Sequence, residues 1–422
     1  MSAGVLQTLK EYHNILFTVF FRFIVFIYRK IHGLPEDMVF IGFSSAWYGG
    51  NVKGLLDACL REKNLVENKQ VRMYFISPNK NQVEYARSMG VESYWWHDLG
   101  AIPVFARTCL FICSHGESSL PVTRRKTFYD FKKDVLGEFG QKLDFNRSDY
   151  QGKGFAVKRL ELWHGIPFKD VYIDKVPIPP DVFCVTSDFM KKCYAGKGYK
   201  SDIFRVTGYP RNDILFAKVD KKEVLSKLNI PAGKQIVLYA PTWGHYTGKG
   251  LFPWKNWAET FEQLDKFAEK RGDVFFVIRT HKYWEGEQDD DVEKTLNSCS
   301  NISWVSMDDY PDTYRLLAVT DVLITDWSSI AFDFMLVRKP IIFIGCPNPY
   351  KKFCFTAEER AGAIVKNQEE LLNVLSDSLG DSKVFIKKYA SNFDKILNKA
   401  FLYKDGKTSE RCIKEIKNLL KK

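Results

Sequence analysis

A histidine in a turn is the first residue of this sequence whose setting suggests chemistry. His164 lies in the segment LWHGIPFK, residues 162–169, directly after a predicted strand at 159–163. Glycine and proline turn the backbone sharply at this point, so the imidazole can face a cleft and serve as a general base near neutral pH. Lys169, further along the segment, supplies a charge suited to phosphate. The alternative interpretation is a hydrogen-bonded histidine of the core.

Two segments that follow predicted strands carry candidates for binding an anion. Thr242 lies in YAPTW, residues 239–243, after a strand at 235–240. Arg279 and His281 lie in IRTHK, and because side chains alternate along an extended chain, both point to the same side, as suits a diphosphate. The alternatives are an ordinary turn for the first segment and a solvated run of charge for the second.

A third segment, ITDWSS, marks the change from a predicted strand to a predicted helix. It contains Asp326, Ser328 and Ser329. Serine hydroxyls and free N–H groups at a helix N-terminus bind phosphate, and the helix dipole favours negative charge there. As plain helix caps, the same residues need no further function.

A turn with the sequence GYPRND, residues 208–213, adds Arg211 and Asp213, with a turn bearing surface charges as the alternative. The glycine-rich run at 244–250 lacks the spacing of a P-loop, and the chain has no GxSxG or HExxH motif. These absences weigh against a hydrolase or an oxidoreductase.

The composition is that of a basic, globular protein. The 422 residues are 45% hydrophobic, 15% aromatic and 27% charged, which excludes a largely disordered chain and favours two or three domains. Sixty-two Lys and Arg against 51 Asp and Glu leave a net charge of +11, which suits phosphorylated substrates, acidic lipid surfaces or nucleic acid. Nine dispersed cysteines without zinc-ligand spacing indicate a reduced, cytosolic protein.

An apolar stretch near the N-terminus predicts a helix at a membrane surface. Residues 15–28 read ILFTVFFRFIVFIY, about 21 Å as a helix against a hydrocarbon core of about 30 Å, with Arg22 near the middle. Basic residues flank the stretch, and no secretory cleavage site follows it. We expect residues 1–33 to form an apolar helix that lies in the membrane interface, with a helix packed on the protein core as the alternative.

Short apolar runs alternate with amphipathic ones over most of the chain. This pattern predicts βαβ units and parallel sheets, with a charged hinge at 219–234. The expected strands are 38–43, 71–77, 109–114, 159–163 and 182–186, then 235–240, 274–279, 302–305, 322–325 and 340–344. We expect two doubly wound α/β domains at 34–225 and 226–395, followed by a basic helix at 396–422. Ligands of such sheets bind beyond the carboxyl ends of the strands, where the segments above lie.

Five motifs together resemble one known family. In order along the chain they are WHGIPFK, GYPRND, YAPTW, IRTHK and ITDWSS. They resemble the motifs of the CDP-glycerol glycerophosphotransferase family of teichoic acid and capsule polymer enzymes. The similarity spans about residues 39–366, including a first strand, loop and helix around 43–51. Ile166 and Phe168 stand where the family more often has Thr and Leu, and Trp327 where Tyr is common.

The resemblance implies a fold and a reaction. We expect a GT-B-like pair of doubly wound domains facing a central cleft, bound peripherally to the cytoplasmic face of the cell membrane. The expected reaction transfers glycerol phosphate or ribitol phosphate from a CDP-activated donor to a hydroxyl of a lipid-linked or polymeric acceptor and releases CMP. No cofactor and no nucleic acid partner are expected, and the use of a divalent metal is left open.

The resemblance also assigns roles to the candidate residues. His164 and His281 would be catalytic. The donor would be bound by Arg279, Thr242, Asp326, Ser328 and Ser329. The acceptor or its phosphate would be bound by Lys169, Gly50, Asn51, Arg211 and Asp213. Two other functions compete with this one: a GT-B glycosyltransferase that uses a nucleotide sugar, and a non-catalytic basic protein that binds membranes or nucleic acid.

Overall fold

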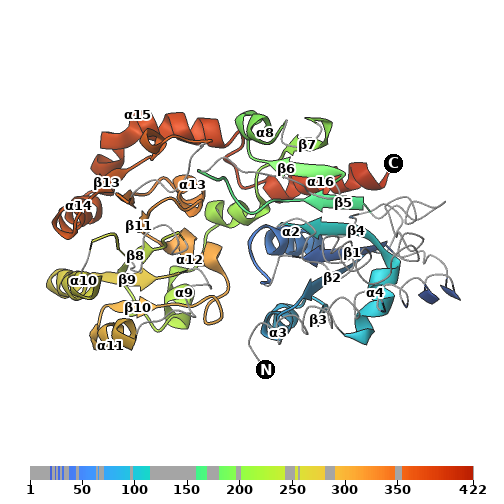
Figure 1. Cartoon of the computed structure of the whole chain (residues 1–422), viewed down its shortest axis with the longest axis horizontal. Helices are drawn as coiled ribbons and strands as arrows, with labels where there is room; N and C mark the ends of the chain where they lie inside the picture. The colour runs from blue at the N-terminus through green and yellow to red at the C-terminus, as the bar shows by residue number, and fades with distance from the viewer. Residues whose placement is uncertain are drawn as a thin grey trace, which may run out of the picture.

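The chain forms two α/β domains side by side, each built on one parallel sheet (Figure 1). The computed structural model describes residues 38–43, 47–62, 65, 71–95, 98–114, 158–168, 180–195, 201–242, 252–254, 257–280, 290–346 and 354–421, with six positions between 20 and 32. The prediction of two doubly wound domains is confirmed.

The first domain is a seven-stranded sheet in the order β3-β2-β1-β4-β5-β6-β7, with parallel pairing throughout the described strands. Its strands are β1 (Met38–Phe43), β2 (Val71–Ser77), β3 (Ser93–Trp95), β4 (Thr108–Cys113), β5 (Lys158–Glu161), β6 (Val182–Val185) and β7 (Phe204–Val206). Its helices are α2 (Gly50–Arg61), α3 (Lys80–Ser88), α4 (Ile102–Arg107) and α8 (Asp188–Tyr194), with the 3₁₀ turns η1 (Leu99–Ala101), η3 (Ser201–Ile203) and η4 (Pro210–Phe216).

The second domain is a six-stranded parallel sheet in the order β10-β9-β8-β11-β12-β13. Its strands are β8 (Gln235–Tyr239), β9 (Val274–Ile278), β10 (Ile302–Trp304), β11 (Val322–Thr325), β12 (Ile341–Ile344) and β13 (Ala363–Val365). Its helices are α9 (Lys221–Lys227), α10 (Trp257–Arg271), α11 (Asp290–Ser298), α12 (Thr313–Val319), α13 (Ile330–Met335) and α14 (Gln368–Gly380), with the turn η5 (Ala357–Glu359).

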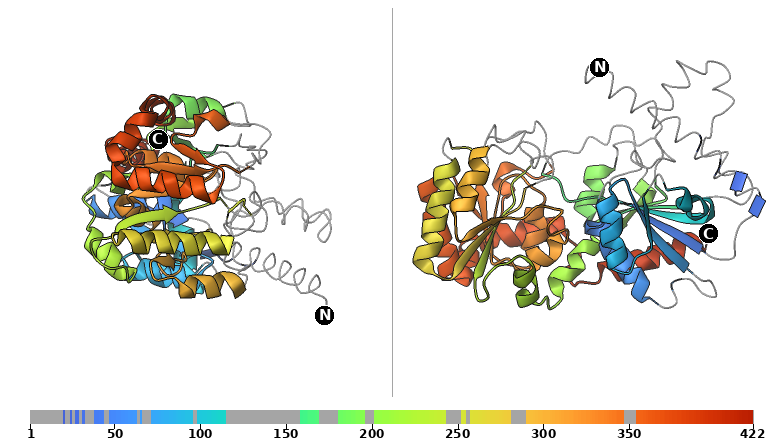
Figure 2. Two further views of the ribbon diagram at one scale, coloured as in Figure 1. Left: turned by 90° about the vertical axis from the view of Figure 1, so that its left-hand side faces the viewer. Right: turned by 90° about the horizontal axis from the view of Figure 1, so that it is seen from below.

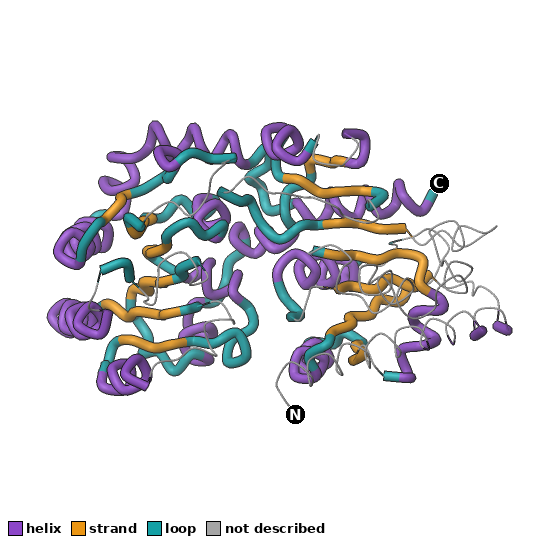
Figure 3. Tube along the Cα trace, in the orientation of Figure 1, coloured by secondary structure: helices purple, strands orange, loops and turns teal. Residues whose placement is uncertain are grey.

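Burial on both faces explains the apolar strands of the second sheet. All five residues of β9, VFFVI, are buried, as expected for a parallel strand covered by helices on both sides. Helices α10 and α14 cover the outer face, whereas α9, α12 and α13 cover the face toward the first domain (Figure 3). The inner core continues into the first domain, because Phe183 and Tyr209 belong to the same cluster as Phe332 and Phe343.

The last two helices join the domains again. Helix α15 (Ser382–Ala400) runs along the second domain, and α16 (Thr408–Leu420) crosses back and packs on α2 and η4 of the first domain (Figures 1 and 2). Cys412 and Ile416 of α16 are buried in the core of the first domain. The C-terminal helix α16 is therefore part of the first domain. The predicted domain boundaries at 226 and 396 fall inside α9 and α15.

Most of the predicted N-terminal helix lies outside the described residues. The six described positions between 20 and 32 are helical. Phe20, Ile27 and Ile31 are exposed, whereas Tyr28 packs against the core beneath α4. Among the described residues, no helix is both long and apolar enough to cross a membrane.

Candidate active site

Thr242 and Asp326 meet where the strand order of the second sheet reverses. Thr242 follows β8 and Asp326 follows β11, the two strands on either side of this switch point. The backbone N–H of Thr242 donates to Asp326 Oδ1 at 2.8 Å, and the Thr242 hydroxyl donates to the same oxygen. Burial raises the pKa of Asp326, while the hydrogen bonds from Thr242 act to lower it. The pair therefore lies at the edge where doubly wound sheets generally bind their ligands.

The loop that carries His164 is held by side chains at four consecutive carbonyl groups. Asn51 Nδ2 donates to the carbonyl groups of the two residues before His164, at 3.2 and 2.8 Å. Arg211 Nη1 donates to the carbonyl oxygen of His164 at 2.6 Å, and the Tyr209 hydroxyl donates to the next carbonyl at 3.3 Å. Trp163 has a φ of 57°, a strained conformation for an aromatic residue. Hydrogen bonds from side chains thus hold the backbone of residues 162–165, while His164 itself is exposed.

Arg211 also joins the two domains. Its Nη2 donates to Oδ2 of Asp333 on α13 at 2.6 Å, and the hydroxyl of Tyr314 on α12 donates to the same oxygen at 2.9 Å. The side chains of Arg211 and Asp333 are 7% and 0% exposed. Burial acts to lower the pKa of Arg211, but the attraction of Asp333 outweighs it and the pKa is raised. Arg211 therefore keeps its charge in a buried ion pair with Asp333.

Ser329 lies against the His164 loop from the other domain. It caps α13 without a side-chain capping hydrogen bond. Its hydroxyl oxygen would lie 2.8 Å from a Cβ placed on Gly165. Ser328 comes directly before it at the carboxyl end of β11. The sequence motifs around His164 and Ser329, far apart in the chain, thus meet at the domain boundary.

Two of the positions that depart from the family pattern, Phe168 and Trp327, pack against each other. The rings of Phe168 and Trp327 make an edge contact at 5.7 Å, and the ring of Phe332 lies 4.6 Å from that of Phe168. The backbone N–H of Cys354 donates to the carbonyl oxygen of Phe168 at 3.0 Å. The end of the His164 loop is therefore anchored in the second domain by aromatic packing.

Arg279 lies at the same edge of the second sheet, directly after β9. Its Nη2 donates to Thr313 Oγ1 at 2.9 Å, and its Nη1 donates to the carbonyl oxygen of Ser306 at 3.3 Å. The residue is 4% exposed. Two nitrogens of the Arg279 guanidinium therefore hold the segment that connects β10 to α12.

Two residues predicted to bind an acceptor have other contacts. Both carboxylate oxygens of Asp213 accept backbone N–H groups at the start of α16, from Thr408 at 2.8 Å and Ser409 at 2.7 Å. Asn51 is 1% exposed, and its amide donates to the His164 loop. We therefore revise both roles: Asp213 caps α16, and Asn51 holds a loop. Gly50 begins α2 with a φ of 56°.

The other predicted residues cannot be placed in the same way. His281 and Lys169 lie outside the described residues. Sequence reasoning missed Asp333 and Tyr314, although one signal was present: Asp333 is the single charge in the apolar helix sequence IAFDFM. Within the described part of the chain, no group of three or more His, Cys, Asp or Glu could hold a metal ion.

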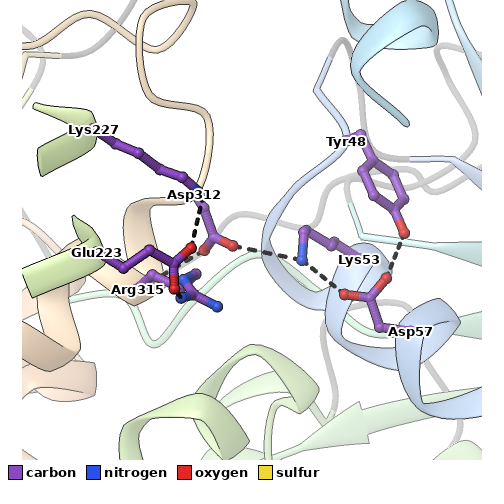
Figure 4. Close-up of polar contacts among 7 residues, drawn as sticks. All are labelled: Tyr48, Lys53, Asp57, Glu223, Lys227, Asp312 and Arg315. Carbon is purple, nitrogen blue, oxygen red and sulfur yellow. Dashed lines mark hydrogen bonds and ion pairs between the residues drawn. The ribbon is translucent and has the colours of Figure 1, made fainter. Parts of the chain in front are cut away.

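A second polar contact spans the domains at α2. Lys53 Nζ lies 2.7 Å from Asp57 Oδ2 on its own helix and 3.5 Å from Asp312 Oδ2 at the start of α12 (Figure 4). The Tyr48 hydroxyl donates to Asp57 at 2.6 Å. Burial acts to lower the pKa of Lys53, but Asp312 and Asp57 outweigh it and the pKa is raised. Lys53 is therefore a charged link between the two domains.

Fold and site together define a GT-B-like protein whose two doubly wound domains meet at the His164 loop. Residues 143–418 match the family described as CDP-glycerol:poly(glycerophosphate) glycerophosphotransferase. The chain belongs to this family.

The curated relatives of this chain are named as teichoic acid polymerases and transferases. The chain is 27% identical over 288 residues to the teichoic acid poly(glycerol phosphate) polymerase of Bacillus subtilis (strain 168), covering 61% of this chain and 37% of the relative. It is 27% identical over 227 residues to the teichoic acid ribitol-phosphate polymerase TarL of Staphylococcus aureus (strain NCTC 8325 / PS 47), covering 50% and 36%. A teichoic acid glycerol-phosphate transferase of the same strain is 26% identical over 306 residues, covering 64% and 73%. The chain thus spans less than half the length of the two polymerases.

Solved structures with the same fold include the wall teichoic acid polymerase TagF. A TagF variant soaked with CDPG superposes with a TM-score of 0.68 at 18% identity and covers 100% of this chain and 99% of that one. The S. aureus MnaA structure with UDP has a TM-score of 0.53 at 13% identity and covers 91% and 97%. At these identities the likeness establishes the GT-B-like fold.

Proposed function

We propose that this protein transfers a glycerol phosphate or ribitol phosphate unit from a CDP-activated donor to an acceptor hydroxyl, with release of CMP. The observation that carries the proposal is the exposed His164 on a fixed loop, whose next residue, Gly165, lies directly against Ser329 of the other domain. Family membership and the names of the relatives give the substrate class. The product would be part of a teichoic acid-like or capsular polymer.

In this reaction His164 acts as the general base. It takes the proton of the acceptor hydroxyl as the hydroxyl oxygen attacks the β-phosphorus of the donor. The new P–O bond forms to the acceptor, and the bond between the β-phosphorus and the bridging oxygen breaks. CMP leaves with the electron pair of that bond, so negative charge grows on the bridging oxygen and the α-phosphate.

The donor binds at the carboxyl edge of the second sheet. We assign the diphosphate to Arg279, Ser328, Ser329 and, beyond the described residues, His281; Thr242 and Asp326 shape the switch point. Three features support this assignment: the strand order, the place of these residues in segments that follow a strand in the sequence, and the position of Ser329 beside the His164 loop. Fixed donors at this edge stabilise the charge of the leaving group.

The acceptor approaches from the first domain, and we assign Gly50 and, beyond the described residues, Lys169 to its binding. We further propose that the acceptor is lipid-linked and that the protein lies peripherally on the cytoplasmic face of the membrane. The exposed residues Phe20, Ile27 and Ile31 support this, because spacings of seven and eleven residues put them on one face of a helix. The net charge of +11 favours acidic lipids.

The experiment is a donor screen. The protein is incubated with CDP-glycerol, CDP-ribitol, UDP-glucose and UDP-N-acetylglucosamine, each with and without a short acceptor primer, and released nucleotides are separated by chromatography. We expect acceptor-dependent CMP from one CDP-polyol and no UDP from the nucleotide sugars. UDP release together with a glycosylated primer would establish the glycosyltransferase instead.

A further inference from the structure

We propose that Arg211, Asp333 and Tyr314 form a positioning unit that sets the backbone of the His164 loop from the donor-binding domain. Arg211 would then not bind the acceptor, and it would influence catalysis without touching substrate. This inference rests on the proposed function of His164 as the base.

The first step of the argument is the geometry of the Arg211 guanidinium. Nη1 donates to the carbonyl oxygen of His164 at 2.6 Å, while Nη2 donates to Asp333 Oδ2 at 2.6 Å. A guanidinium is a rigid planar fork, so fixing one nitrogen on Asp333 fixes the direction of the other. The position of the His164 carbonyl therefore depends on where Asp333 lies.

The second step is that Arg211 has little freedom to take another partner. Its guanidinium carbon lies 5.1 Å from the ring centre of Tyr209 and 5.0 Å from that of Tyr314, so it is enclosed between two aromatic rings. Its side chain is 7% exposed. A ligand phosphate would have to displace Asp333, which is completely buried and would be left without its counter-ion.

The third step is that Tyr314 fixes Asp333. The Tyr314 hydroxyl donates to Asp333 Oδ2 at 2.9 Å. Burial raises the pKa of Tyr314 well above its ordinary value, so the hydroxyl remains a donor at any physiological pH. Oδ2 thus receives two hydrogen bonds, which hold it in one place between α12 and α13.

The last step connects this unit to the donor side. Asp333 lies on α13, the helix that begins directly after Ser328 and Ser329. A shift of α13 when a donor binds at those serines is transmitted through Asp333 and Arg211 to the His164 backbone. The arrangement thus couples the donor-binding edge to the orientation of the base.

The test uses two variants of the full chain and one matched control. Tyr314→Phe removes the hydroxyl that holds Asp333. Arg211→Lys keeps the charge but replaces the rigid fork, whose two nitrogens reach Asp333 and the His164 carbonyl, with a single ammonium on a flexible stem. Tyr94→Phe is the control, because its hydroxyl also donates to a carboxylate, that of Glu92, at 2.9 Å but lies on the remote edge strand β3. Steady-state kinetics are measured with the active CDP-polyol and primer, and calorimetry gives the donor Kd.

We expect kcat to fall about 10- to 100-fold for Arg211→Lys and several-fold for Tyr314→Phe, because misplacing a catalytic group by about 1 Å can cost about 100-fold. The donor Kd and both KM values should stay within about twofold of wild type, and Tyr94→Phe should match wild type. An unchanged kcat in both variants, or a loss confined to the KM of the acceptor, would overturn the proposal.

A second measurement keeps the proposal separate from the proposed reaction. Hydrogen–deuterium exchange of the peptide covering residues 158–168 needs no substrate, and both variants should increase its exchange more than that of any peptide in β8 or β9. If wild-type protein releases no CMP but this increase occurs, the proposed function fails and the positioning unit stands. If exchange is unchanged, the positioning unit fails regardless of activity.

Discussion

Gly165 and Ser329 approach each other so closely that no side chain fits between them. A Cβ placed on Gly165 would lie 2.8 Å from Ser329 Oγ and 3.1 Å from Ser329 Cβ. Gly165 has a φ of 157°, which L-residues with a side chain rarely adopt. The contact therefore sets how near the His164 loop comes to the second domain.

We expect Gly165→Ala to lower kcat by at least about tenfold and to cost about 1–3 kcal/mol of stability, because the added methyl group overfills the contact. Ser329 Oγ can rotate away, but its Cβ stays at 3.1 Å, so the double variant Gly165→Ala with Ser329→Gly should recover part of the lost stability. Recovery should be incomplete because the backbone strain at Gly165 remains. Thermal unfolding and CMP release measure both effects. Wild-type activity and stability in Gly165→Ala would contradict the packing argument.

The ion pair between Lys53 and Asp312 should help to hold the two domains together. We expect Lys53→Met to leave the stability within about 1 kcal/mol, since both side chains are partly exposed, but to loosen the domain contact. Small-angle scattering should show a larger radius of gyration at low salt. Lys227→Met is the matched control, because its ion pair with Glu223, 2.7 Å long, lies within α9 (Figure 4). Identical scattering from the two variants would show that Lys53 does not link the domains.

Ionisation of Asp326 should lower the stability of the folded protein, whereas ionisation of Asp321 should raise it. Burial raises the pKa of Asp326, so its ionised form costs stability at neutral pH, and this cost vanishes below the unfolded-state pKa of about 4. Burial also opposes ionisation of Asp321, but Lys339 and Lys221 outweigh it and lower the pKa, so its ionised form stabilises at neutral pH and that contribution is lost as the pH falls below about 4.

Thermal unfolding of two Asn variants from pH 7 down to about pH 3 checks these signs. Asp326→Asn should be more stable than wild type at pH 7, because the amide oxygen can still accept from Thr242, and the gain should shrink toward pH 4. Asp321→Asn should be less stable at pH 7, with a loss that stays constant down to about pH 4 and shrinks only below it. A destabilised Asp326→Asn at pH 7 would mean that the carboxylate stabilises the switch point.

The sequence predicts most accurately the positions of residues that follow the carboxyl ends of strands. Thr242 and Asp326 were both predicted from the change of pattern after an apolar run, and they lie in direct contact although 84 residues separate them. Parallel strands bring their carboxyl ends to one edge of a sheet, so predicting the strands predicts this neighbourhood. The same reasoning placed Ser329 and His164 on facing edges.

Partners fixed by tertiary packing could not be predicted in this way. Arg211 and Asp333 are 122 residues apart, and Asp213 contacts α16 across 195 residues, so no local pattern links them. Polar residues such as Asn51 and Asp213 look like ligand-binding groups in a sequence, because the sequence does not show which backbone groups they reach. Strands β3, β7 and β13 were not predicted, and a strand of three residues carries little periodicity, although β10, which is equally short, was predicted.

CMP release by wild type and by His164→Ala, measured in parallel under saturating CDP-polyol and primer, tests the central claim most directly. A positioned base contributes about 10²- to 10⁴-fold to the rate, so we predict a loss of kcat in this range while calorimetry finds an unchanged donor Kd. A His164→Ala variant that keeps near wild-type kcat, or one that fails only because it no longer binds the donor, would contradict the account.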